Sequence, residues 1–222
     1  MSTNFMPEAQ ALSLHLGAHP QQASGFRIVS GFVKALEDVR RVTGRDAATG
    51  SVLPATDGIV SGSWIGAIGY MCLIDQIGSS FKPRAITALN EPRSFCKALK
   101  YFSSLSENEI LALYALRNAF AHDYSLYNVN QKEPLLTHRF KVSAGLDPKI
   151  VTLPTMQWDG TEAGKRSNNE TAINLRAFGN AVESICAEIC RSASTGDLEI
   201  ILPGGSDELI SRYAFMITPS NL

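Results

Sequence analysis

The chain has few cysteines, no excess of either charge and no secretory signal, and each absence removes a class of protein. Its four cysteines include no C-x-x-C pair, and its four histidines lie outside any zinc-finger spacing. No residue cluster has metal-ligand spacing, and no cofactor is expected. The N-terminus lacks a basic stretch before its apolar residues, so the expected location is cytoplasmic, with reduced thiols.

The charge balance argues against a protein whose main task is to coat nucleic acid. Twenty Lys and Arg face twenty-one Asp and Glu, which leaves a formal net charge of −1. Nucleic-acid-coating domains usually carry a large basic excess. An enzyme that touches RNA through a local patch is compatible with this composition. With 45% hydrophobic residues, the chain is expected to fold as a single globular domain over 1–222.

The apolar stretch from Gly58 to Ile74 carries no charge, so it is the segment to consider as a membrane span. Its 17 residues reach only the lower edge of what spans a bilayer, and its flanks lack a basic anchor. Glycines at every fourth position from Gly58 would let a neighbouring helix approach closely. We therefore expect a buried central helix and no membrane partner, with a membrane span as the alternative.

Helical spacing of apolar residues predicts most of the remaining elements. The clearest signal is a capping box, Ser106 followed by Glu109, which opens a helix. The other expectations are an irregular segment over 1–23, a helix capped by Ser24, a loop over 43–57, a helix that begins at Pro92 and a long helix over 170–194.

The sequence changes character between 129 and 169. Alternating residues over 137–142 and a second apolar run over 149–153 predict a small inserted β-hairpin, followed by a polar loop. The segment 198–222 is expected to add a short strand and a weak helix as a C-terminal extension. The predicted fold class is therefore all-α, an up-and-down helical bundle with a small inserted β-hairpin.

The residues that suggest chemistry lie at the end of the Ser106 helix, in R-N-A-F-A-H-D-Y over 117–124. Helical residues step by about 100°, so Asn118 and His122 lie within about 40° of each other, and Arg117 lies about 100° from Asn118. The apolar stripe of the helix lies on the other side. Arginine offers a permanent forked charge to phosphate, and histidine changes charge near neutral pH.

Such a pair can carry phosphodiester chemistry without a metal, because one group moves the proton and the other stabilises charge on phosphorus. The structural alternative is that Arg117 and His122 cap helix carbonyls in a bundle of unrelated function. Tyr114 could stack a base or pack beside the helix. Lys97 and Lys100 belong to the basic stretch 82–100, which is either an RNA contact or a solvated helix face.

R-N-A-F-A-H-D-Y resembles the signature of the HEPN superfamily, the helical domains named for higher eukaryotes and prokaryotes nucleotide-binding. That pattern is Arg, a polar residue, three more residues, then His, and it is matched by Arg117, Asn118 and His122. A subgroup of toxins, paired with a minimal nucleotidyltransferase, extends it to His-x-Tyr, which Tyr124 completes. The match covers about eight residues, and the hairpin has no counterpart that we can place in the family.

The resemblance implies a metal-independent endoribonuclease, with a toxin or phage-defence role, whose composite active site lies at a homodimer interface. His122 would move the proton during attack of the ribose 2′-OH, Arg117 would stabilise the phosphorane and Asn118 would orient one of them. Single-stranded RNA would yield 2′,3′-cyclic phosphate ends. Tyr124 would accept adenylate groups from a nucleotidyltransferase antitoxin. The alternative is that Tyr124 only packs against the end of the helix. The alternative is a non-catalytic HEPN module that binds a nucleotide or a partner protein.

Overall fold

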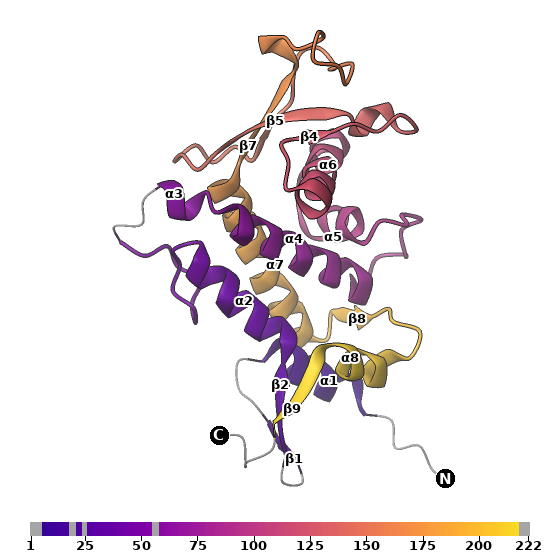
Figure 1. Ribbon diagram of the computed structural model, residues 1–222. Coiled ribbons are helices and arrows are strands. Elements are labelled where there is room, and N and C mark those ends of the chain that lie inside the picture. The colour runs from indigo at the N-terminus through magenta and orange to yellow at the C-terminus, as the bar shows by residue number, and fades with distance from the viewer. Residues whose placement is uncertain (1–5, 18–20, 24–25, 55–57, 218–222) are drawn as a thin grey trace.

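The computed structural model of the chain describes residues 6–17, 21–23, 26–54 and 58–217. Helices form its body, and a four-stranded sheet covers one end of that body (Figure 1). The helices are α1 (Glu8–Leu16), α2 (Gly31–Val42), α3 (Gly58–Ser61), α4 (Trp64–Ser80), α5 (Ser94–Phe102), α6 (Glu107–Asp123), α7 (Leu175–Thr195) and α8 (Gly205–Tyr213), with 3-10 turns η1 (Pro134–Leu136) and η2 (Ser167–Asn169).

Three small sheets make the fold mixed α/β, and the all-α prediction is wrong. Their strand orders are β1-β2-β9, β3-β8 and β4-β5-β7-β6. Phe140, Val151 and Ile173 of the four-stranded sheet are buried in the same core as the helices, so this sheet is part of the body. The strands are β1 (Gln21–Ala23), β2 (Phe26–Ser30), β3 (Phe81–Pro83), β4 (Tyr127–Asn128), β5 (His138–Ser143), β6 (Val151–Thr152), β7 (Glu170–Asn174), β8 (Leu198–Ile200) and β9 (Ala214–Ile217).

The predicted hairpin is wrong in its pairing, although both of its strands exist. β5 pairs in parallel with β7, and β6 pairs with the other edge of β7 in the antiparallel sense. β7 occupies residues where the sequence predicted the first turn of the long helix. That helix, α7, begins later because the Asn174 side chain accepts hydrogen bonds from the N–H groups of Arg176 and Ala177, at 3.1 and 3.2 Å.

The N-terminal expectations also need correction. The segment 1–23, expected to be irregular, contains α1, whose Ala11, Leu12 and Leu14 are buried. Ser24 lies outside the described residues, and the cap of α2 is Ser30, whose hydroxyl accepts from the Val33 N–H at 3.1 Å. At the C-terminal end, β8 confirms the predicted short strand, and α8 is followed by a further strand, β9.

The uncharged stretch forms two helices instead of one. α3 ends at Ser61, and Ser63 caps α4 by accepting from the Gly66 N–H at 3.2 Å. α4 then packs against α2, α5, α6 and α7 (Figure 1). A Cβ atom on Gly78 would lie 1.9 Å from the Ser94 carbonyl oxygen, so glycine allows α4 to lie directly against α5. No helix within the described ranges is long and apolar enough to cross a membrane.

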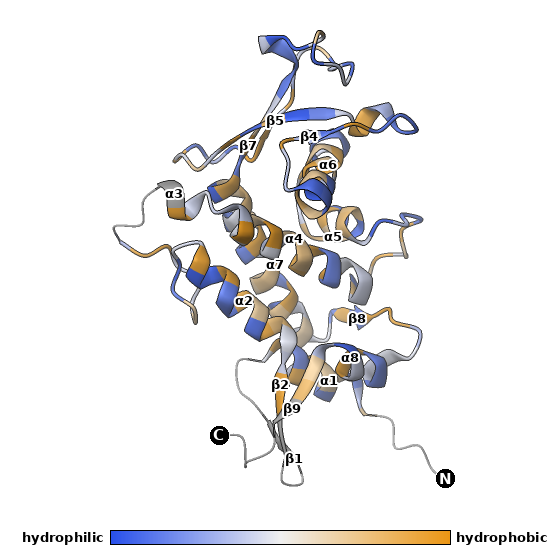
Figure 2. Ribbon diagram, viewed as in Figure 1, coloured by the Kyte–Doolittle hydropathy of each residue, from blue (hydrophilic) through white to orange (hydrophobic). Residues whose placement is uncertain are grey.

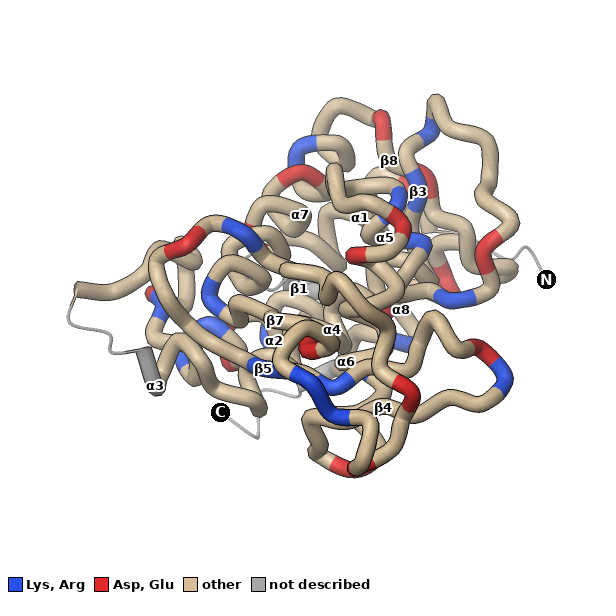
Figure 3. The backbone as a smooth tube through the Cα atoms, turned by 90° about the horizontal axis from the view of Figure 1, so that it is seen from above, with Lys and Arg blue, Asp and Glu red and all other residues tan. Residues whose placement is uncertain are grey.

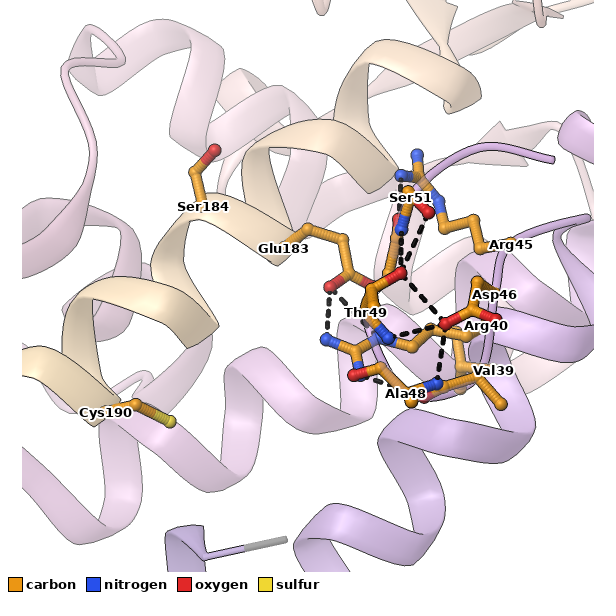
Figure 4. A network of polar contacts seen from close by, with 12 residues as sticks. Val39, Arg40, Arg45, Asp46, Ala48, Thr49, Ser51, Glu183, Ser184 and Cys190 are labelled. Atoms are coloured by element: carbon orange, nitrogen blue, oxygen red, sulfur yellow. Dashed lines mark hydrogen bonds and ion pairs between the residues drawn. The ribbon is translucent and has the colours of Figure 1, made fainter.

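A half-buried polar network joins α2, α4 and α7. Arg40 of α2 donates to both carboxylate oxygens of Glu183 on α7, with the Nη2–Oε2 contact at 2.7 Å (Figure 4). The Tyr70 hydroxyl of α4 donates to the same carboxylate at 2.8 Å. Arg40 also donates to the carbonyls of Ala47 and Ala48. The network therefore fixes the loop after α2 as well as the three helices.

His15 of α1 is fully buried among aromatic rings. The rings of Phe32, Phe81 and Tyr213 lie 5.4 to 5.7 Å from its imidazole. Its Nε2 lies 3.4 Å from the Gln76 amide nitrogen, and its Nδ1 has no hydrogen-bond partner among the described residues. Burial lowers the pKa of His15 to about 4. The imidazole is therefore neutral in the folded protein near neutral pH.

Acidification is expected to destabilise the protein through His15. The unfolded chain gains a proton near the ordinary pKa of about 6.5, whereas the folded chain resists it down to about 4, so stability falls as the pH drops through this window. The loss attributable to His15 is at most about 3 kcal/mol. Urea unfolding at pH 7 and pH 4.5 measures it, with His15→Leu as the comparison. Equal losses in the two proteins would contradict the expectation.

Candidate functional site

Helix α6 presents its motif at an exposed C-terminal end. The predicted capping box is confirmed at the other end, where the Glu109 carboxylate accepts from the Ser106 N–H at 2.9 Å and the Ser106 hydroxyl accepts from the Glu109 N–H at 3.4 Å. Apolar side chains bury one side of the helix in the core, and Figure 2 shows polar residues in blue on its exposed part. The buried residues are Ile110, Ala112, Leu113, Ala115, Leu116, Ala119 and Phe120.

Arg117 is held in place by two oxygen atoms. Its Nε donates to Asp75 Oδ2 of α4 at 2.9 Å, and its Nη1 donates to Asn118 Oδ1 at 3.3 Å. The side chains of Arg117 and Asp75 are 32% and 27% exposed. The two contacts orient the guanidinium plane, and its Nη2 makes no hydrogen bond to a described residue. An anion could bind through the N–H groups of Nη2.

His122 is exposed and makes no hydrogen bond, ion pair or ring contact within the part of the chain that is described. Five helical steps separate it from Arg117, which places the two side chains about 140° apart around α6. They therefore point away from each other within one chain, with Asn118 between them. On helical geometry alone, one chain does not direct the guanidinium and the imidazole toward the same point.

Tyr124 ends α6 in the left-handed conformation, with φ 50° and ψ 45°. Its ring lies 5.1 Å from Trp64 at the start of α4 and 6.1 Å from Phe120. Half of the residue is exposed, at 50%. Trp64 is half-buried and stacks on Phe120. The tyrosine thus packs on the end of the helix and also reaches solvent.

The other candidate RNA contacts take part in packing and ion pairs. Tyr114 is half-buried, with its ring 6.2 Å from Phe95 and the Arg93 guanidinium over its face at 5.4 Å. Lys100 pairs with Glu91 at 3.1 Å and also with Glu107. Burial alone would raise the pKa of Glu91, but hydrogen bonds from Arg93 and Lys100 lower it to about 2.

Most of the basic stretch 82–100 is neutralised by carboxylates. Lys82 pairs with Glu199, and Arg84 pairs with Glu8. Lys97 is half-buried and has no ion pair with a described residue. Figure 3 shows Lys and Arg interspersed with Asp and Glu around the backbone, in keeping with the near-zero net charge. This stretch does not form an uncompensated patch for a nucleic-acid backbone.

Two residues beside the motif were missed from the sequence. Asp75 is the first charged residue after the uncharged stretch, and this isolation on an apolar helix was the only available signal. Cys72 lies one turn before it and is exposed. Burial and the Asp75 carboxylate raise the pKa of the Cys72 thiol, whereas Arg117 opposes the shift. Cys72 is therefore a protonated neighbour of the Arg117–Asp75 pair at neutral pH.

The described residues include no group of three or more His, Cys, Asp or Glu that could hold a metal ion. Comparison with family models, curated proteins and solved structures found no match to this chain.

Proposed function

We propose that the protein is a metal-independent endoribonuclease that acts as a homodimer with a composite active site. The observation that carries the proposal is the exposed end of α6, where Asp75 and Asn118 orient Arg117 and where His122 faces solvent with no hydrogen bond or ion pair to a described residue. A preoriented guanidinium on one subunit and an exposed imidazole on the other would suit the charge that develops on a phosphodiester.

The proposed reaction is attack of a ribose 2′-OH on the adjacent phosphorus. His122 accepts the hydroxyl proton as the new P–O bond forms, and the Arg117 guanidinium stabilises the negative charge of the phosphorane. The bond to the 5′-oxygen then breaks, and this oxygen takes a proton from a protonated imidazole. The products are a 2′,3′-cyclic phosphate and a 5′-hydroxyl. Asn118 keeps Arg117 in the plane that binds the phosphate.

The angle between Arg117 and His122 on α6 supports a homodimer. Since they diverge by about 140° within one chain, a second copy related by a two-fold axis can supply the missing partner. The same dimer would provide two imidazoles, one to accept the proton and one to donate it. A role in the cytoplasm as a toxin or in phage defence, with Tyr124 adenylated by an antitoxin, belongs to the proposal through the motif resemblance alone.

The proposal predicts cleavage of single-stranded RNA by the purified protein in the presence of EDTA. The products should carry 2′,3′-cyclic phosphate and 5′-hydroxyl ends, and a DNA oligonucleotide of the same sequence should stay intact because it lacks the 2′-OH. Gel analysis with end-group mass spectrometry measures both. Cleavage that requires an added divalent metal would contradict the proposal. A folded dimer that binds RNA but never cleaves it would favour the non-catalytic module.

A further inference from the structure

A stack of three aromatic rings runs from the core to the surface next to the Arg117–His122 site. Trp64 lies nearly flat on Phe120, with ring centroids 4.9 Å apart and planes 22° apart. Tyr124 leans against Trp64 at 5.1 Å. Phe120 is buried, Trp64 is half-buried and Tyr124 is half-exposed. The last ring of the stack is therefore accessible to a ligand.

The backbone of Tyr124 adopts a conformation that a bulky residue rarely takes. Within the described ranges it is the only non-glycine residue with a positive φ. Glycine or asparagine would end the helix there with less strain. The contacts with Trp64 and Phe120 offset part of this cost, and they hold the tyrosine ring two residues beyond His122. A strained aromatic residue at this place suggests a role beyond helix termination.

The polar atoms of the stack are unpaired within the described residues. Neither the Trp64 indole N–H nor the Tyr124 hydroxyl makes a hydrogen bond to another residue in the described part of the chain. Tyr124 follows Arg117 by seven residues and comes directly after the last residue of α6. Tyr124 packs on Trp64, and Arg117 is paired with Asp75, so the aromatic platform and the guanidinium both lie against α4.

We propose that Trp64 and Tyr124 form a stacking subsite for one unpaired nucleobase of a bound RNA strand. The inference rests on the proposed function and names its substrate class: a strand whose base is unstacked from its neighbours, with a phosphate close enough to reach Arg117. Every nucleobase has a π-face, so such a subsite selects single strands over duplexes and reads little sequence.

Binding of a probe that cannot be cleaved tests the subsite separately from catalysis. The probe is a fluorescent 2′-O-methyl oligoadenylate, and its affinity is measured by anisotropy in EDTA. Tyr124→Asn removes the ring and suits the left-handed backbone, so the end of the helix is kept. We expect it to weaken binding about 5- to 100-fold, and Tyr124→Phe to stay within about two-fold of the wild type.

The matched control is Tyr127→Asn, since Tyr127 is also a half-exposed tyrosine, at 41%, three residues further along the chain. Its ring contacts Trp158 and lies beneath the Lys165 ammonium, away from the stack. It should leave binding unchanged, and an abasic version of the probe should bind the wild type as weakly as the full probe binds Tyr124→Asn. Equal affinity of the wild type and Tyr124→Asn, or an equal loss in Tyr127→Asn, would overturn the subsite.

RNA cleavage, assayed in parallel, separates the two proposals. If the wild type cleaves RNA but its RNA binding does not depend on Tyr124, the subsite is refuted and the proposed ribonuclease activity stands. Tyr124-dependent binding without cleavage of any RNA would support the subsite and refute catalysis. When both hold, Tyr124→Asn should raise KM for RNA while kcat is kept, because stacking is a binding contact that does not change in the transition state.

Discussion

Replacement of His122 by alanine is expected to reduce RNA cleavage by about 10²- to 10⁴-fold, the usual effect of removing a proton-transfer group. The fold should be unaffected, since the side chain is exposed and makes no hydrogen bond, ion pair or ring contact with a described residue. Single-turnover cleavage in EDTA measures the rate, and thermal unfolding checks the fold. Asn108→Ala, an exposed change at the opposite end of α6, is the control and should cleave at the wild-type rate.

Two companion experiments distinguish a reacting histidine from a capping one. Arg117→Lys keeps the charge but loses the planar fork, so it should also cleave poorly. A mixture of His122→Ala and Arg117→Ala subunits should recover cleavage that neither protein shows alone, because a mixed dimer pairs an intact arginine with an intact histidine across the interface. Full cleavage by His122→Ala would show that the site is wrongly assigned, and no recovery in the mixture would argue against a composite site.

Replacement of Glu183 by alanine is expected to destabilise the protein by about 3 to 5 kcal/mol, the typical cost of breaking a buried ion pair. The side chains of Arg40 and Glu183 are only 14% and 13% exposed. The change leaves the Arg40 guanidinium without its carboxylate and the Tyr70 hydroxyl without its acceptor. Urea unfolding at pH 7 measures the free energy of unfolding.

The control for this prediction is Glu188→Ala on the same helix. Glu188 pairs with Arg191 at the surface, where the side chains are 42% and 58% exposed, and such pairs contribute about 1 kcal/mol or less. The double change Arg40→Met with Glu183→Leu should cost less than Glu183→Ala, since it leaves no uncompensated charge. Similar losses in Glu183→Ala and Glu188→Ala would show that the half-buried network contributes little.

Elements with a local signal were predictable from the sequence. The α6 capping box needs only Ser106 and Glu109, three residues apart, and it is present as expected. The four-stranded sheet depends on contacts between distant segments, such as the pairing of Phe140 with Thr171. Residues 170–174 could continue a helix or form a strand, and the decision is made by β5 on one side and the Asn174 cap on the other.

In the candidate site, too, the residues of one helix could be predicted from the sequence, whereas their partners from other segments could not. The order and spacing of Arg117, Asn118 and His122 can be read from the chain, because all three lie on one helix. Asp75 comes from a different helix, and its 2.9 Å contact with Arg117 depends on how α4 packs against α6. Trp64 meets Tyr124 for the same reason. A partner brought by tertiary packing has no sequence spacing that could reveal it.

The pairing of β2 with β9 has a consequence for how the protein is made. Arg27 and Ile217 are register partners, so this sheet joins segments from the two ends of the described chain (Figure 1). During synthesis from the N-terminus, β2 must wait until residues 214–217 have been made before it can pair. The segments that form α4 and α6 leave the ribosome much earlier. A chain released early would therefore contain Arg117 and His122 but lack the strand that completes the sheet.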